Sequence, residues 1–509
     1  MALNLFMTAF PTRFDKLENL RYLNLSEAGF TGQIPIEISR LTRLATLDLS
    51  IDTLFRTTLK LEKPNLKTLV QNLTKLRFLH LYGVNISAMG NEWCQALTPL
   101  TELQVLSINN LSGLIPQFFT KFPNLTCISL SSVNFSGPIP SFSSSINLRD
   151  LILALNQLNG TIHSTDWSGL SKLEIIGLGN NKLSGTIPPT LFGIPSLRTL
   201  SLSHNQFNGS IGDFHGKASS LINTLDLSNN MLQGQFPMFV FELHGLTSLN
   251  LSSNNFSGLI PVSAFQNLRN LSALGLSYNR WSIDATTINI SSVSFPTLAE
   301  LDLASCNLTE FPGFLKNRIS LHVLDLSKNQ IHGKIPDWIW KPIDLARLNL
   351  SQNFLVGFER PLKNITSSVE ILDLHGNQLQ GEIPILSNAA YLDYSNNNFN
   401  SVLPAQIGDS LQYAFFFSLS NNNIQGSIPE SICNSNILKR NNLSGIISDT
   451  SSKSCQLQTL NLNQNRLEGK VPNSLVNCKM VKLLDIGNNH INDSFPSHLK
   501  NIATLQQIQ

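Results

Sequence analysis

Residues 321–336 read LHVLDLSKNQIHGKIP, and this stretch decides the fold because close copies of it recur along the whole chain. Residues 246–261 read LTSLNLSSNNFSGLIP, and residues 457–472 read LQTLNLNQNRLEGKVP. The central L-x-L returns about every 24 residues over roughly twenty copies, and such self-similarity at a fixed period is the signature of a stacked repeat protein. We therefore expect one continuous solenoid.

Each position of the repeat has a physical role. L-x-L alternates with period two, so it predicts a short strand with both leucines facing inward. The asparagine three residues after the second leucine turns inward, where its amide satisfies backbone groups at the bend. In G-x-I-P, which occurs eight times unchanged, glycine permits the bend and proline stops further strand pairing. This pattern, with a period inside the 20–29 residue window, is that of leucine-rich repeats.

The predicted fold class is an α/β-type repeat solenoid: an arc with a parallel concave β-sheet and a convex side of loops and 3-10 turns. The inward asparagine slot is held by Asn205, Asn230, Asn254, Asn279, Asn329, Asn353, Asn377, Asn397, Asn422, Asn465 and Asn489. Cys306 occupies the same slot in its own repeat, which argues against a redox role.

The pattern weakens at several places. Residues 1–19 read as a degenerate first repeat without a cap, and residues 20–509 as a continuous array of about 20 repeats. Extra residues predict an outward loop near 55–67 and a small insertion near 285–296, and residues 88–97 look helical. No cap is recognisable at either end, and no secretory signal or membrane-spanning segment is found, so we expect a fragment or a gene with deletions.

Composition limits the function. Charged residues are 13% and the net charge is +2, which gives no case for nucleic acid as a partner. No nucleotide-binding, metalloprotease, kinase or esterase motif is present, and the ten histidines are scattered. We therefore predict a binding protein with no catalytic residues, no cofactor and no metal.

Several stretches closely resemble plant receptor-like proteins of the Verticillium-wilt-resistance type. The likeness is carried by residues 14–50, residues 69–97 (LVQNLTKLRFLHLYGVNISAMGNEWCQAL), residues 391–399 (YLDYSNNNF), residues 416–434 and residues 483–496 (LLDIGNNHINDSFP). The resemblance implies a receptor of the plant plasma membrane with an extracellular repeat domain. It also implies pathogen perception in plant defence, and signalling through a partner receptor kinase. The resemblance further implies the ligand, a pathogen- or host-derived protein or peptide bound on the concave face. The alternatives are a secreted protein similar to polygalacturonase inhibitors, and a non-functional receptor remnant.

Candidate ligand-binding residues interrupt the Ser/Asn background of the concave positions, and aromatic and arginine side chains are favoured interface anchors. They are Tyr22, Phe78, Tyr82, Tyr278, Arg347, His375, Tyr391 and Phe416. The position between the two leucines holds Asn24, Asp48, His80, Asp226, Asn250, Asp302, Asp325, Asn349, Asp373, Asp393, Asn461 and Asp485. This row suits either a basic ligand or calcium, but a solvated ladder that keeps the sheet soluble is the simpler interpretation.

Covalent modification has candidates too. Seventeen N-x-[ST] sequons fit a secreted glycoprotein, although N-L-S also arises from the repeat itself; the best placed are Asn85, Asn289 and Asn364. Cys455 and Cys478 lie one repeat apart, which makes them either a disulfide or two buried thiols.

Overall fold

The computed structural model describes most of the chain in two compact units, residues 1–258 and residues 259–509. The residues outside the description are 1–7, 12, 52–58, 88–91, 110, 118, 120–121, 163–166, 168, 212–217, 262–264, 266, 285–296, 317–319, 342–343, 361–366, 385, 387–388, 406, 408–413, 415, 427–428, 430–442, 448, 450–458, 495 and 509.

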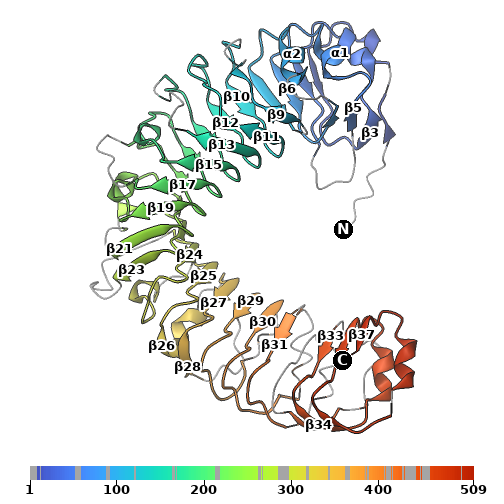
Figure 1. The fold of residues 1–509 in the computed structure, drawn as a ribbon, viewed down its shortest axis with the longest axis vertical. Helices are drawn as coiled ribbons and strands as arrows, with labels where there is room; N and C mark the ends of the chain where they lie inside the picture. The colour runs from blue at the N-terminus through green and yellow to red at the C-terminus, as the bar shows by residue number, and fades with distance from the viewer. Residues whose placement is uncertain are drawn as a thin grey trace. The chain divides into compact units, whose positions relative to one another are not determined.

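In the first unit, the L-x-L segments form one parallel sheet, which we call the L-x-L sheet (Figure 1). Its strands are β2 (Tyr22–Asn24), β4 (Thr46–Asp48), β6 (Phe78–Leu81), β8 (Val105–Ile108), β10 (Cys127–Ser129), β12 (Asp150–Ile152), β14 (Ile175–Gly177), β16 (Thr199–Ser201), β18 (Thr224–Asp226) and β20 (Ser248–Asn250). Equivalent residues pair across each step, as Leu200 does with Leu225. The predicted parallel repeat sheet is confirmed.

The second unit repeats this arrangement. Its strands are β22 (Ala273–Gly275), β24 (Glu300–Asp302), β25 (Val323–Asp325), β27 (Arg347–Asn349), β29 (Ile371–Asp373), β30 (Tyr391–Asp393) and β31 (Phe416–Ser418), followed by β33 (Thr459–Asn461), β35 (Leu483–Asp485) and β37 (Gln507–Ile508). Here too the pairing is parallel and in register, for example between Leu372 and Leu392. The side chains of β33, Asn461 among them, lie outside the description.

A second set of parallel strands follows the asparagine in many of the repeats, where the sequence predicted only a bend. In the first unit these are β1 (Thr8–Ala9), β3 (Phe30–Gln33), β5 (Leu59–Leu61), β7 (Asn85–Ile86), β9 (Ser112–Leu114), β11 (Asn134–Gly137), β13 (Gln157–Thr161), β15 (Lys182–Gly185), β17 (Gln206–Gly209), β19 (Met231–Gly234) and β21 (Asn255–Pro261). In the second they are β23 (Arg280–Asp284), β26 (His332–Ile335), β28 (Phe354–Phe358), β32 (Ser444–Ile446), β34 (Arg466–Gly469) and β36 (His490–Ile491). Five of these strands, β11, β15, β17, β19 and β34, end at a glycine. In β15 this is Gly185, whose φ of +78° turns the chain away from the ladder.

Short helices close many of the coils, most of them shortly after a proline. They are η1 (Phe14–Lys16), η2 (Ile36–Arg40), η4 (Pro189–Leu191), η5 (Met238–Glu242), η7 (Gly313–Leu315), η8 (Asp337–Trp340), η10 (Asn473–Asn477) and η11 (Ser497–Asn501), with α-helices α1 (Leu66–Val70) and α2 (Glu92–Leu97). In η2, η8 and η10 the proline itself is the N-cap residue. The predicted 3-10 character of this side is confirmed.

The structure bears differently on each of the irregular stretches predicted from the sequence. The described part of the loop predicted near 55–67 is not a plain loop: residues 59–61 form β5, which pairs with β3, and Asn65 caps α1 by accepting from the backbone N–H of Thr68. The helical stretch predicted at 88–97 is α2 in its described part. In the degenerate first repeat, β1 pairs in parallel with β3. The insertion predicted near 285–296 lies outside the described residues.

The inward asparagines link successive coils. The Asn329 Nδ2 donates to the carbonyls of Leu303, Leu326 and Ser327 at 2.8, 3.0 and 3.1 Å. Its Oδ1 accepts from the backbone N–H groups of Cys306 and Leu308 at 2.9 and 3.0 Å. One buried side chain therefore satisfies backbone groups of two neighbouring repeats.

The same bonding recurs with small variations in the other inward asparagines. Asn205, Asn230, Asn254, Asn353, Asn377, Asn397, Asn422 and Asn489 each donate to carbonyls of their own and of the preceding coil. Asn279 and Asn465 donate to carbonyls of their own coil. Cys306 fills the slot with Sγ at 3.6 Å from the carbonyls of Leu276 and Ala304, and burial raises the pKa of this thiol to about 12.

We predict that Asn329→Ala lowers the free energy of unfolding by about 2–4 kcal/mol, because it leaves several buried backbone groups without partners. Urea unfolding followed by circular dichroism measures this loss. The control is Asn398→Ala, since Asn398 is exposed and lies outside the inward slot. Equal midpoints for the two variants would contradict the role given to the inward amide.

Candidate functional site

The open face of the L-x-L sheet is the side opposite the buried leucines, and it carries the residues flanking each leucine. In β29 and β30 the central leucine is fully buried while the residues on either side are partly exposed. Because parallel strands in register place equivalent residues side by side, this face consists of rows of like positions. The rows hold every candidate ligand-binding residue except those on the following bend.

The structure divides the eight candidates between the two units. Tyr22, Phe78 and Tyr82 belong to the first unit, where Tyr22 is 62% exposed. The second unit holds Tyr278, Arg347, His375, Tyr391 and Phe416. Of these, Tyr391 and Phe416 are register partners on β30 and β31, and His375 follows the neighbouring strand β29.

Tyr278 has a different setting from the strand residues. It lies on the bend after β22 with φ +56°, a backbone conformation that is uncommon for tyrosine. The Lys328 Nζ lies 5.1 Å from the centre of its ring, within the range of a cation–π contact. Tyr278 is therefore held at the rim of the open face rather than along it.

Tyr391 and Phe416 form a flat aromatic surface. They are register partners on β30 and β31, with ring centres 4.4 Å apart and planes 8° apart. Both side chains are partly exposed. Burial, Asp393, Asp373 and a hydrogen bond with Asp393 raise the pKa of the Tyr391 hydroxyl to about 12, so this hydroxyl stays protonated.

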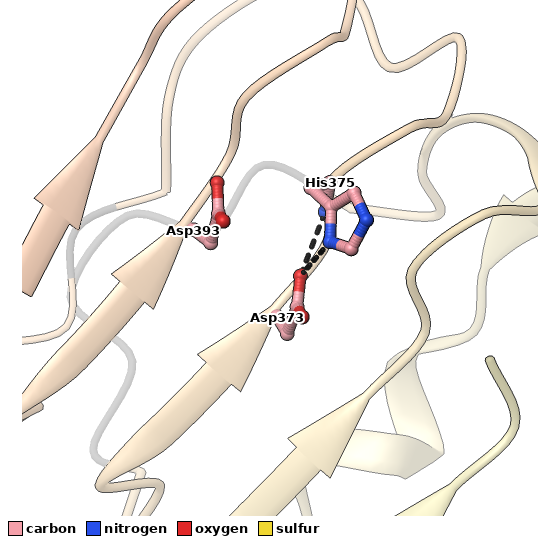
Figure 2. Close-up of side chains that lie close together, drawn as sticks. All are labelled: Asp373, His375 and Asp393. Atoms are coloured by element: carbon pink, nitrogen blue, oxygen red, sulfur yellow. Dashed lines mark hydrogen bonds and ion pairs between the residues drawn. The ribbon is translucent and has the colours of Figure 1, made fainter.

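Asp373, His375 and Asp393 lie close together (Figure 2). Both carboxylates are near enough to Tyr391 to raise the pKa of its hydroxyl. The Asp373 Oδ1 accepts from the backbone N–H of His375 at 3.0 Å and lies 2.7 Å from the His375 Nδ1. The His375 Nε2 lies 3.0 Å from the amide nitrogen of Gln352, which can only donate. That assigns the ring proton to Nδ1, where it is donated to Asp373.

In this group of three residues, the neighbouring carboxylates Asp373 and Asp393 repel each other when both are ionised. Burial raises the pKa of Asp373, its hydrogen bonds with His375 lower it, and the neighbouring Asp393 raises it further; the net direction is upward. Among the described residues, these three form the one group of three metal-capable side chains, with ligand atoms within 4.8 Å of one another. Chemically the group offers carboxylate oxygens to a cation.

A second pair of adjacent carboxylates lies two strands away. Asp302 and Asp325 are register partners on β24 and β25. The Asp325 Oδ1 accepts from the backbone N–H of Ser327 at 2.8 Å, and its Oδ2 accepts from Asn349 at 3.2 Å. Asp302 has no such support among the described residues, because the equivalent N–H, that of Ala304, donates instead to the Ser277 hydroxyl at 2.8 Å.

Among the described carboxyl groups of the row, Asp302 has the most strongly raised pKa. Burial, and next the charges of Asp325 and Glu300, raise its pKa to about 6. Sequence reasoning placed Asp302 in the solvated ladder and had no signal for this difference. The signal lies in the preceding repeat, whose Ser277 takes the N–H that would have stabilised the carboxylate.

The modification candidates are partly described. Asn85 is exposed on β7, whereas Asn289 and Asn364 lie outside the described residues. Cys478 is disulfide-bonded; its partner lies outside the description, as does Cys455, so the Cys455–Cys478 pair stays a prediction. Cys94, Cys127 and Cys306 are free thiols. No helix in the described part of the chain has the length and apolar character needed to cross a membrane.

Comparison with known families identifies the repeats. The family described as "Leucine rich repeat" matches residues 146–207 and 220–280, and a second leucine-rich-repeat family matches residues 19–41, 320–342, 416–435 and 456–478. The matched ranges lie in both units and include L-x-L strands such as β14, β18 and β25.

The similar proteins of known sequence are plant receptor-like proteins. Receptor-like protein 41 of Arabidopsis thaliana is 34% identical over 435 residues, which cover 85% of this chain and 45% of that protein. Receptor-like protein 49 of the same plant is 42% identical over 288 residues, covering 56% of this chain and 28% of that protein. The chain thus spans less than half the length of these relatives.

Similar solved structures include those of plant receptors. The structure of PEPR1–AtPEP1 has a TM-score of 0.72 and 27% identity, covering 98% of this chain and 73% of that one. The Arabidopsis receptor kinase HAESA, in complex with the peptide hormone IDA and the co-receptor SERK1, has a TM-score of 0.71 and 26% identity, covering 99% of this chain and 88% of that one. The chain is a leucine-rich-repeat protein, and the relatives it resembles over most of its length are plant receptor-like proteins.

We predict that Asp302→Asn stabilises the protein above pH 6 and not at pH 4. A carboxyl whose pKa in the folded state is about 6, raised from 3.8, binds its proton more tightly when folded, so stability falls as pH rises between these values. The variant should regain about 1–3 kcal/mol at neutral pH. Urea unfolding at several pH values measures the difference.

The matched control is Asp226→Asn in the first unit. The Asp226 carboxylate accepts from the backbone N–H and the hydroxyl of Ser228 at 3.1 and 2.7 Å, so its replacement should not stabilise the protein. A pH-independent effect of Asp302→Asn would contradict the assignment.

Proposed function

We propose that the chain is the ligand-recognition part of a plant cell-surface receptor-like protein in pathogen perception and defence signalling, of the Verticillium-wilt-resistance type. It binds a protein or peptide on the open face of the L-x-L sheet and acts through a partner receptor kinase. The proposal places the chain on the extracellular side of the plasma membrane. It treats the chain as a binding module without catalytic residues.

The observation that carries the proposal is the open face of the second unit. Tyr391 and Phe416 present a rigid flat surface, with Asp373, His375 and Asp393 beside it. At the open-face positions that flank the buried leucine, small polar residues are enough to keep the sheet soluble. Exposed aromatic side chains that contact each other at these positions are therefore not needed for folding. Rigid aromatic groups bordered by charged groups are typical of interface anchors.

The solved relatives support the choice of ligand class. The HAESA structure contains a peptide hormone and a co-receptor, and another similar structure is that of the plant peptide hormone receptor RGFR1 in complex with RGF2. The latter has a TM-score of 0.69 and 27% identity, covering 98% of this chain and 79% of that one. These assemblies motivate a peptide ligand and a receptor-kinase partner here.

The open face of the second unit also bears on the two alternatives, an inhibitor-like protein and a non-functional remnant. A polygalacturonase-inhibitor-like protein would act on an enzyme, and nothing on the described surface favours that over a peptide. In a non-functional remnant, no requirement for binding would retain the register pair Tyr391 and Phe416 on the open face.

We predict that Tyr391→Ala and Phe416→Ala each weaken peptide binding at least about tenfold, because each removes an interface anchor worth more than about 1.4 kcal/mol. The secreted chain is panned against a peptide display library, and enriched peptides are measured by calorimetry. The control is Phe354→Ala, which removes a 43%-exposed aromatic side chain on β28, outside the L-x-L sheet. Absence of any enriched peptide, or equal loss in all three variants, would contradict the proposal.

We predict that Asn85 carries a glycan when the chain passes through the plant secretory route, since its sequon is exposed on the edge strand β7. Peptide mass spectrometry should find the glycan on the wild type and lose it in Asn85→Gln. An unmodified Asn85 in secreted protein would count against the extracellular assignment of this surface.

A further inference from the structure

The negative charge of the open face is concentrated in the second unit. The position between the leucines is aspartate at Asp302, Asp325, Asp373 and Asp393, on four of five consecutive strands. The fifth strand, β27, carries Asn349 at this position. In the first unit the same row is mostly neutral, with Asp48 and Asp226 on strands far apart in the ladder. Folding of the repeat therefore does not require this charge.

The four carboxylates form two pairs with a gap between them. Asp302 and Asp325 are adjacent in register, and so are Asp373 and Asp393, while Asn349 separates the pairs. Adjacent like charges in a sheet are destabilising, and each pair contains a carboxylate whose pKa is raised by its neighbour and by burial. A cation seated between the members of a pair would relieve this repulsion.

The spacing of the pairs selects the ligand. Strands in a sheet lie about 4.8 Å apart, and the midpoints of the pairs are three strand steps apart, or about 14 Å. An extended peptide rises about 3.4 Å per residue with alternate side chains on one face, so residues i and i+4 point the same way about 13.6 Å apart. Residues i and i+2, about 6.8 Å apart, are too close to reach both pairs.

Two further features fit the same ligand. Arg347 is exposed on β27, the strand that carries Asn349 between the two aspartate pairs. Its positive charge would repel a basic residue at position i+2 of the peptide and would favour a neutral or acidic residue there. The stacked rings of Tyr391 and Phe416 lie next to the Asp373–Asp393 pair and provide an apolar wall for the methylene stem of a lysine or arginine.

Resting on the proposed function, we propose that the ligand is an extended basic peptide that crosses β24 to β30, with a lysine or arginine at i between Asp302 and Asp325, and another at i+4 between Asp373 and Asp393. A neutral or acidic residue at i+2 faces Arg347 and Asn349. The occupant is thus a peptide of defined charge spacing rather than any polycation.

The test uses the full secreted chain and two synthetic nine-residue peptides of identical composition. One has lysines at the third and seventh positions, glutamate at the fifth and serine elsewhere; the other has the lysines at the fourth and sixth. The first peptide should bind about fivefold or more tightly than the second in calorimetry at low ionic strength, since one anchor of the second cannot reach its pair. Binding should weaken as salt is added.

Asparagine substitutions locate the two anchors without disturbing the coil. Asn349 already occupies this row and accepts from the backbone N–H of Ser351 at 3.1 Å, so the fold tolerates asparagine there. Asp302→Asn and Asp393→Asn should each weaken binding of the first peptide about three- to tenfold, whereas Asp226→Asn in the first unit should not. Arg347→Glu should reverse the preference at i+2, so that a peptide with lysine at its fifth position becomes the better ligand.

Equal affinity for the two spacings, no measurable binding of the first peptide, or indifference to both Asp302→Asn and Asp393→Asn would overturn the inference. Library panning separates this failure from that of the proposed function. Enriched peptides that lack the basic pair but lose affinity in Phe416→Ala would overturn the charge spacing alone. A library with no enriched peptide would overturn both.

Discussion

The inward asparagine amide is the interaction on which the rest of the structure depends. Leucine burial drives the coils together, but it is indifferent to the register in which they stack. The amide of Asn329 bonds carbonyls of its own coil and of the preceding one, and its oxygen accepts from the preceding bend. These bonds have one geometry only, so they fix each coil against the next and keep strands such as β24 and β25 in register.

Strict register has a consequence for the open face. It places the same repeat position of every coil in one row. Charged or aromatic residues that recur at that position in consecutive repeats therefore become neighbours on the sheet. For Tyr391 and Phe416 this produces a parallel stack. For Asp302 and Asp325 it produces repulsion, which is tolerable only because ionised groups near a surface are partly screened. Recognition features and electrostatic strain therefore arise from the same constraint.

Periodicity made the L-x-L strands and the asparagine slot predictable from sequence, since each depends on residues within one repeat. The second set of strands was missed because the N-x-L-x-G segment looks like a bend in isolation; β15 and β17 become strands only by pairing with neighbouring coils. The raised pKa of Asp302 was not predicted from the sequence for a related reason. Burial and the charges of Asp325 and Glu300 raise the pKa of Asp302, and Ser277, one repeat earlier, takes the Ala304 N–H that could offset them. No pattern within a single repeat reports such a competition. The grouping of His375, Tyr391 and Phe416 likewise follows from strand order, whereas Tyr22 and Phe78 shared the same sequence signal and lie in the other unit.

The contrast between the two units is the strongest argument that the second has been shaped for a ligand. Both units use the same coil, the same amide bonds and the same buried leucines, so their folding needs are alike. What differs is the row between the leucines, which holds Ser129 and Gly177 on strands that keep the same parallel register. Paired carboxylates in that row are expected to lower stability, because like charges on adjacent strands repel. The basic peptide proposed above would offset that loss when bound.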